Sequence, residues 1–307
     1  MKKYLLSMSL AALMATSALV PRATAQRVPQ ASPAATVIQT VGVTDFTIQY
    51  SRPFLKGRKV FANESALAPY DQLWRTGANM ATLFEASTEF TFGGKKVPAG
   101  KYALFSIPNG AAWTVILNKN YNQGGSDNYK ESEDVARATV VPTSNEFNEA
   151  FKIEIVPVTD STAFLNLSWS SVNVPVPLAV STESLTLTAL NKAVAEKPED
   201  VATLQSTAGY LLSKGKDLQV ALSLADKAIG LKESFGALWT KAQILNKLGK
   251  TAEAIPVAQK ALTVGAAAPD GAYNFYKPQV EKAISEMQAK AAPVKEAAAT
   301  AVKKKKK

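Results

Sequence analysis

The sequence predicts a multidomain chain of the β then α class. An antiparallel β-sandwich or jelly-roll domain is expected over residues 36–178, and an α-helical repeat domain over residues 181–290. In the first region apolar residues alternate with polar ones, which is typical of half-buried strands. In the second they recur at helical spacing, with small residues repeated every 33 or 34 positions. We therefore expect a boundary near residues 174–184, where the period changes.

The first 25 residues have the pattern of a secretory signal peptide. Two lysines precede an apolar stretch from Leu5 to Val20, and Ala23-Thr24-Ala25 forms a small-x-small cleavage sequence. The apolar stretch is shorter than the roughly 20 residues that span a bilayer, which disfavours a membrane anchor. We expect cleavage near Ala25, a periplasmic or extracellular location, a linker over residues 26–35 and no transmembrane span in the mature chain.

Three segments of the β domain show alternation with a period of two residues. These are Phe46 to Tyr50, Phe151 to Ile155 and Ala163 to Trp169. Glycine and proline clusters between residues 93 and 110 predict turns, because Gly permits positive φ and Pro presets turn geometry. About eight strands with no intervening helical period favour a sandwich or jelly roll.

The turn clusters divide the stretch from Phe90 to Leu117 into consecutive hairpins. Lys101 to Ile107 and Trp113 to Leu117 are predicted as adjacent strands. The segment Val174-Pro175-Val176-Pro177 is predicted as an edge strand or exit linker, since proline donates no ladder hydrogen bond.

A repeat organises the helical region, which opens with a helix from Leu185 to Ala195. The repeated residues are Ala208, Leu211 and Gly215, which recur as Ala242, Leu245 and Gly249, and Ala221, Ala225 and Ala228, which recur as Ala254, Ala258 and Ala261. This spacing resembles the tetratricopeptide repeat, with Phe235 to Leu262 as the best match; a generic pair of helical hairpins is the alternative. A third pattern covers Tyr273 to Ala289, and residues 291–307 are expected to form a disordered tail.

Charge and missing residue types exclude several classes of function. The chain has no Cys and no His, so disulfides, Cys or His metal sites and Ser-His-Asp catalysis have no residues to form them. Of the formal charge of +10, most comes from the first 25 and the last five residues. The remaining sequence is nearly neutral, so no nucleic-acid partner is predicted. No cofactor-binding or metal-binding motif is found either.

One part of the β domain is more distinctive than a generic sandwich. Its motifs are Tyr50-Ser51-Arg52-Pro53, Lys56-Gly57-Arg58, Leu73-Trp74-Arg75-Thr76-Gly77-Ala78-Asn79, the segment from Gly94 to Leu104, and Trp113-Thr114-Val115-Ile116. In order and spacing they resemble the bacterial domain-of-unknown-function family numbered twenty-nine eleven, over about residues 32–178. The resemblance implies an exported protein, in some cases with appended helical repeats, and it implies no particular reaction.

These motifs supply the candidate ligand-binding residues, which are Arg52, Lys56, Arg58, Trp74, Arg75 and Asn79. An arginine guanidinium suits carboxylate or phosphate, and a tryptophan face suits a ring or sugar, so an anionic or carbohydrate ligand is predicted. The alternative is structural: Arg75 pairs with Asp71 or Glu85, and Trp74 fills the core.

The favoured function is a binding or scaffolding protein whose helical repeat contacts a protein or peptide. The alternative is a cell-envelope hydrolase that uses carboxylates, with Glu131, Glu133 and Asp134 as the nearest candidates for an acid pair. The sequence assigns no catalytic residue. A hydrolase should gather acids in one pocket, whereas a binding protein should show an arginine cleft or an apolar groove.

Overall fold

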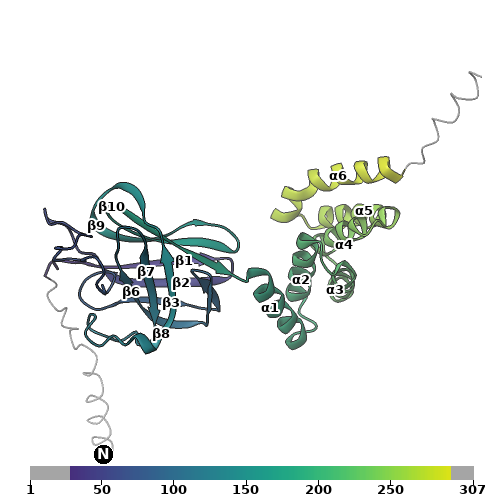
Figure 1. Ribbon diagram of the computed structural model, residues 1–307. Helices are drawn as coiled ribbons and strands as arrows, with labels where there is room; N and C mark the ends of the chain where they lie inside the picture. The colour runs from purple at the N-terminus through teal and green to yellow at the C-terminus, as the bar shows by residue number, and fades with distance from the viewer. Residues whose placement is uncertain (1–27, 292–307) are drawn as a thin grey trace, which may run out of the picture. The chain divides into compact units, whose positions relative to one another are not determined.

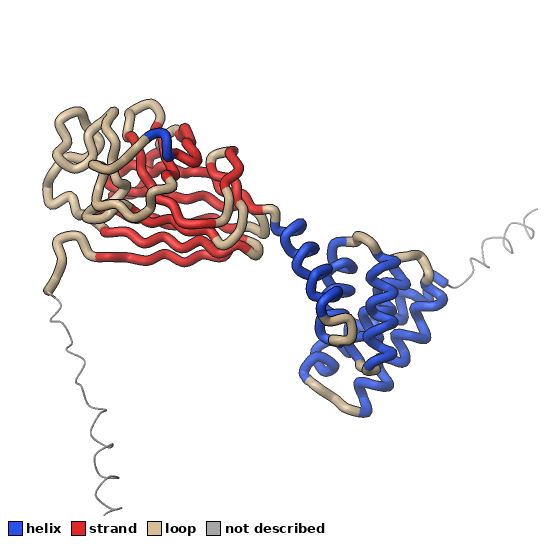
Figure 2. The backbone as a smooth tube through the Cα atoms, turned by 90° about the horizontal axis from the view of Figure 1, so that it is seen from below, coloured by secondary structure: helices blue, strands red, loops and turns tan. Residues whose placement is uncertain are grey.

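The computed structural model describes residues 28–291 and divides the chain into two compact units between Val180 and Ser181 (Figure 1). Within the described residues, the first unit contains ten strands and one short 3-10 turn, and the second contains six α-helices. Strands and helices occupy separate stretches of chain (Figure 2), which confirms the predicted β then α class. The predicted signal peptide and the tail beyond Ala291 lie outside the described residues.

The first unit consists of two antiparallel sheets. The six-stranded sheet has the order β1-β2-β3-β6-β7-β8 and contains β1 (Ala34–Val41), β2 (Thr44–Ser51), β3 (Thr82–Ala86), β6 (Gly100–Ile107), β7 (Trp113–Asn118) and β8 (Asp134–Val140). The four-stranded sheet has the order β5-β4-β10-β9 and contains β4 (Phe90–Phe92), β5 (Lys95–Val97), β9 (Thr143–Val158) and β10 (Thr162–Val180). The ten strands exceed the expected eight by two, and the short strands β4 and β5 lie in the stretch that was predicted to form hairpins.

The alternation predicted from the sequence separates the core face of each sheet from its outer face. Phe46, Ile48 and Tyr50 on β2 are buried. The alternating apolar positions are buried on β9 from Phe151 to Ile155 and on β10 from Ala163 to Trp169. Side chains from both sheets meet in one apolar cluster, as in a sandwich. The predicted hairpin is confirmed, since β6 and β7 pair antiparallel from Ala103–Asn118 to Ile107–Thr114.

The segment Val174-Pro175-Val176-Pro177 is not a linker, because it lies inside β10. Pairing of β10 with β9 ends at Asn173, and pairing with β4 begins at Leu178. The two prolines therefore occupy positions at which β10 pairs with neither neighbour, and their missing N–H groups cost no ladder hydrogen bond. Val174 and Val176, which alternate with the two prolines, are buried.

A long loop over residues 52–81 connects β2 to β3. It is attached to the sheets by two isolated bridges, Phe54 to Ala150 and Trp74 to Ser106. Of the seven non-glycine residues with positive φ in the described chain, five lie in this loop: Lys56, Phe61, Asp71, Thr76 and Asn79. Such backbone strain persists only where the surroundings determine the conformation, and it gathers at functional sites. The loop therefore has a defined path.

The second unit contains α1 (Thr182–Glu196), α2 (Val201–Lys214), α3 (Leu218–Leu231), α4 (Phe235–Lys247), α5 (Thr251–Ala267) and α6 (Gly271–Ala291). Asp200 and Ser234 cap α2 and α4 with side-chain hydrogen bonds to backbone N–H groups. Gly215 and Gly249 follow these helices with positive φ. The alanines and leucines of the 33- and 34-residue spacing are all buried, so small side chains let each pair of helices approach closely.

Candidate functional site

A cavity of about 300 Å³ in the β unit is lined by four of the six candidate residues. These are Arg58, Trp74, Arg75 and Asn79. The other lining residues are Ser32, Pro53, Ala66, Leu67, Pro69, Leu73, Gly77, Ala78, Ser126 and Trp169. The lining contains two arginines and no carboxylate, and we call it the arginine cavity. Arg52 and Lys56 are not part of its lining.

Arg75 is half-buried and held by the main chain. Its Nη1 donates a hydrogen bond to the carbonyl oxygen of Asn79 at 2.9 Å. Its guanidinium lies against Gly125, where a Cβ would come within 3.2 Å of Nη1, and the φ of +101° at Gly125 also favours glycine. The acids expected to pair with Arg75 have other partners: Asp71 accepts from Asn109, and Glu85 pairs with Lys101. Among the described residues, no carboxylate lies within ion-pair distance of Arg75.

Arg58 is exposed at the rim and is also held by main-chain carbonyls. Its Nε donates to Leu55 at 2.9 Å and its Nη2 to Phe54 at 2.8 Å. Within residues 28–291 this guanidinium has no acidic partner either. Both arginines of the cavity are therefore oriented without being neutralised.

The remaining two basic candidates attach the long loop to β9. Arg52 Nε donates to the carbonyl oxygen of Phe151 at 3.0 Å. The backbone N–H of Lys56 donates to the Glu149 carboxylate at 2.7 Å. The side chain of Arg52 and the backbone of Lys56 therefore position the loop.

Trp74 contributes to the cavity as part of its floor. Its ring is 6% exposed and lies nearly parallel to Trp169, with 5.8 Å between ring centroids and an interplanar angle of 19°. Its Nε1 donates to the carbonyl oxygen of Gly77 at 3.1 Å. Phe61 and Phe151 approach the ring edge-on. Because aromatic neighbours surround the ring, it offers no face on which a ligand could stack.

Asn79 fixes the backbone at the cavity rim. Its φ is +62°, and its Nδ2 donates to Ser51 Oγ at 3.1 Å and to the carbonyl oxygen of Ser32 at 3.4 Å. The residue thus joins the long loop to β2 and to the segment that precedes β1. Its carbonyl oxygen is the one that holds Arg75.

Two of the three acidic candidates for a hydrolase, Glu131 and Asp134, are engaged in ion pairs and hydrogen bonds. Oε2 of the third, Glu133, is buried without a hydrogen-bond partner in the described chain. Asp134 accepts hydrogen bonds from Tyr129 Oη at 2.7 Å and Asn118 Nδ2 at 2.9 Å, and Arg137 pairs with both Asp134 and Glu131. Burial, together with the hydrogen bond to Asp134, raises the pKa of Tyr129. None of the cavities described here is lined by these acids. Their contacts favour a structural role over the hydrolase hypothesis.

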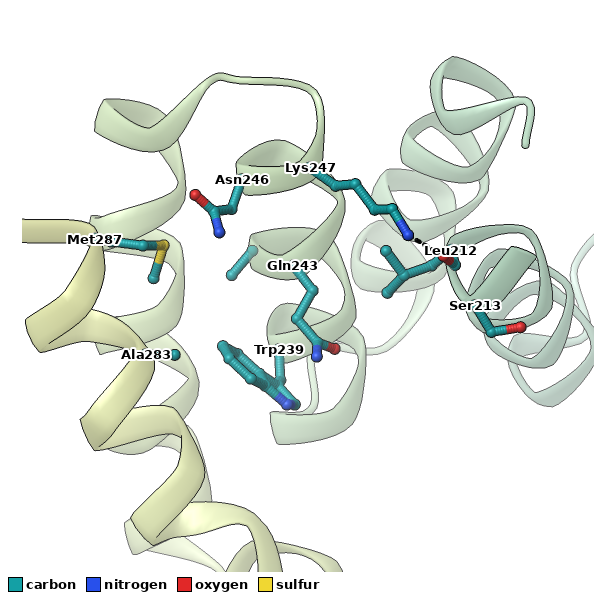
Figure 3. Close-up of a pocket in the computed structure, with 9 residues that line it drawn as sticks. Leu212, Ser213, Trp239, Gln243, Asn246, Lys247, Ala283 and Met287 are labelled. Atoms are coloured by element: carbon teal, nitrogen blue, oxygen red, sulfur yellow. Dashed lines mark hydrogen bonds between the residues drawn. The ribbon is translucent and has the colours of Figure 1, made fainter. Parts of the chain in front are cut away.

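A second cavity, of about 460 Å³, lies within the helical unit (Figure 3). Its lining residues are Leu212 and Ser213 on α2, Trp239, Ala242, Gln243, Asn246 and Lys247 on α4, and Ala283 and Met287 on α6. The α4 residues are spaced by three or four positions and therefore share one helix face. We call this cavity the helical groove.

The helical groove combines apolar and hydrogen-bonding side chains. Figure 3 shows Trp239 and Met287 on one side, and Lys247 extending toward α2, where its Nζ donates to the carbonyl oxygen of Leu212 at 3.3 Å. Asn246 Oδ1 accepts from Thr251 Oγ1 at 3.0 Å. No Asp or Glu is among the lining residues.

Sequence reasoning predicted a binding repeat and named Ala242 as a repeat position, but it assigned none of the groove residues to binding. The spacing from Trp239 to Gln243 and Asn246 is visible in the sequence, because four and three positions place all three on one helix face. The contributions of α2 and α6 depend on how the helices pack. No local sequence pattern marks the α2 and α6 residues as part of the groove.

The described chain has no helix that is both long and apolar enough to cross a bilayer. Searches of the curated proteins and of the solved structures found no match to the chain. A scan against family models found one match, over residues 32–178, to the family described as "Protein of unknown function (DUF2911)". The match covers the β unit and supports its assignment to this family of unknown function.

Proposed function

We propose that this protein is an exported binding module whose helical unit holds an extended peptide segment of a partner protein. The observation that carries this proposal is the helical groove, in which one face of α4 lies between residues of α2 and α6. Surfaces of this kind, formed by stacked helical hairpins, are suited to extended segments. The 34-residue spacing supports a tetratricopeptide-like repeat.

The lining of the groove indicates which peptides should bind. Trp239, which is half-buried, provides apolar area for a large aliphatic or aromatic side chain, and the buried Met287 also lines the groove. Gln243 is exposed, and its amide can bind a peptide backbone, which carries one donor and one acceptor per residue. Lys247 adds a positive charge without an acidic partner in the described chain. We therefore expect a segment that combines an apolar residue with a carboxylate.

Selection from a phage-displayed library of random linear peptides tests this proposal. Peptides that bind the immobilised chain should be enriched in acidic residues next to large apolar ones. The double substitution Gln243→Ala with Lys247→Gln should weaken binding of a selected peptide about tenfold or more, because hydrogen bonds to charged groups contribute about 1.5–3 kcal/mol. Isothermal titration calorimetry measures the change.

The matched control is Gln259→Ala with Lys227→Gln. Both control residues are exposed, on α5 and α3, and neither lines the groove. The control should bind like the unmodified chain. Failure of the library to yield binders, or equal loss in both double variants, would contradict the proposal.

Export is a separate part of the proposal, and the mass of the mature protein tests it. If Ala23-Thr24-Ala25 is the cleavage sequence, protein released from cells by osmotic shock should begin at Gln26. Intact-mass measurement distinguishes this product from the full chain. Retention of residues 1–25, or recovery only with membranes after a salt wash, would show that the segment is not a cleaved signal.

A further inference from the structure

We infer that the arginine cavity of the β unit binds a small oxyanion, a carboxylate or phosphate group carried by a compact molecule. This site is independent of the helical groove, since every residue lining it belongs to the β unit. The inference rests on the charge of the lining, the unused hydrogen-bond donors, the rigid support of the guanidinium groups and the size of the cavity.

The lining has an uncompensated positive charge. Arg58 and Arg75 both line the cavity, and its residues include no Asp or Glu. Outside the cavity, Arg137 is neutralised by Glu131 and Asp134, whereas Arg52 donates to the carbonyl oxygen of Phe151. Two arginines of permanent charge without an acid in the same cavity favour an anion from outside the chain.

The two guanidinium groups retain most of their donors. Each arginine has five N–H donors. Within the described residues, Arg58 donates hydrogen bonds to two carbonyl oxygens and Arg75 donates to one. The remaining N–H groups can form the charge-assisted, forked hydrogen bonds that carboxylates and phosphates accept.

The support of Arg75 is rigid. Its guanidinium is held between the Asn79 carbonyl oxygen and the backbone at Gly125. The floor beneath the cavity is the stacked pair Trp74 and Trp169, both buried. An anion that binds here therefore orders few side chains, which lowers the entropic cost of binding.

The size of the cavity and the burial of its tryptophans indicate the size and chemical class of the ligand. A volume of about 300 Å³ lies at the lower end of the range for small-molecule sites. Trp74 is 6% exposed and stacks on Trp169, which disfavours a neutral sugar held by stacking on its ring. Recognition therefore depends on charge and on forked hydrogen bonds, and a compact oxyanion fits both requirements.

Calorimetric titration of the whole protein tests the inference with three probes: inorganic phosphate, malonate, and malonamide as the neutral counterpart of malonate. At least one of the two anions should bind, and malonamide should not. Binding of phosphate alone assigns a phosphate-bearing ligand, and binding of malonate alone assigns a carboxylate. Absence of binding by both anions at millimolar concentration overturns the inference, as does equal binding of malonate and malonamide.

Substitutions test whether the anion binds in the arginine cavity. Arg75→Gln should weaken anion binding at least tenfold, and Arg58→Lys should weaken it less, because the charge stays while the fork is lost. Arg137→Gln is the matched control, since it removes the same charge outside the cavity and should leave binding unchanged. Thermal unfolding without ligand establishes that each variant is folded. If Arg75→Gln does not fold, Arg58→Gln takes its place. Unchanged anion affinity in a folded variant of either cavity arginine contradicts the inference.

Discussion

Replacing Trp74 with alanine is expected to lower the free energy of unfolding of the β unit by about 3–5 kcal/mol, the range for a large aromatic residue removed from a core. The ring is 6% exposed, lies on Trp169 and has its centroid 5.0 Å from that of Phe151. Alanine leaves a cavity between these rings and removes the hydrogen bond from Nε1 to Gly77. Urea denaturation of the full chain, followed by tryptophan fluorescence, measures the loss.

The control for this prediction is Phe147→Ala on β9. Phe147 is 64% exposed, so the substitution should change stability by no more than about 0.5 kcal/mol. Circular dichroism at the helical band should be nearly the same in both variants, since the helical unit has its own core. A small effect of Trp74→Ala would show that the residue is not a structural part of the floor.

Replacing Gly265 with alanine is expected to destabilise the helical unit. A Cβ at this position on α5 would lie 2.2 Å from Cδ2 of Tyr273, a buried ring packed edge-on against Phe235. Overpacking of this kind typically costs about 1–3 kcal/mol, which exceeds the gain of up to about 1 kcal/mol from the better helix propensity of alanine. Thermal unfolding followed by circular dichroism should show a lower midpoint.

Gly209→Ala provides the matched comparison. Gly209 lies within α2, and a Cβ there would meet no atom within 4 Å, so alanine should stabilise this helix. The two substitutions are chemically identical and should change the stability of the helical unit in opposite directions. In a Tyr273→Ala background, Gly265→Ala should cost less, because the clashing ring is absent. A cost unchanged by Tyr273→Ala would rule out the clash as its cause.

Part of the candidate site was visible in the sequence. Turn-forming motifs containing Arg58, Trp74, Arg75 and Asn79 marked the long loop, and four of the six candidate residues do share a cavity. Which four was not predictable, because the carbonyl oxygens that Arg52 and Arg58 meet are set only when the loop folds. The partners of Asp71 and Glu85 likewise depend on segments distant in the sequence.

Local sequence patterns were sufficient to predict the two units, the alternating core faces of the strands and the spacing of the helical hairpins. These features follow from local periods of about two and 3.6 residues and from small residues at recurring positions. Tertiary structure alone decided that the prolines at 175 and 177 continue β10 and that the faces of Trp74 are covered. It also brought Ser32, Arg75 and Trp169 around one cavity. Such outcomes depend on contacts between residues far apart in the chain, and no local pattern specifies which distant groups will meet.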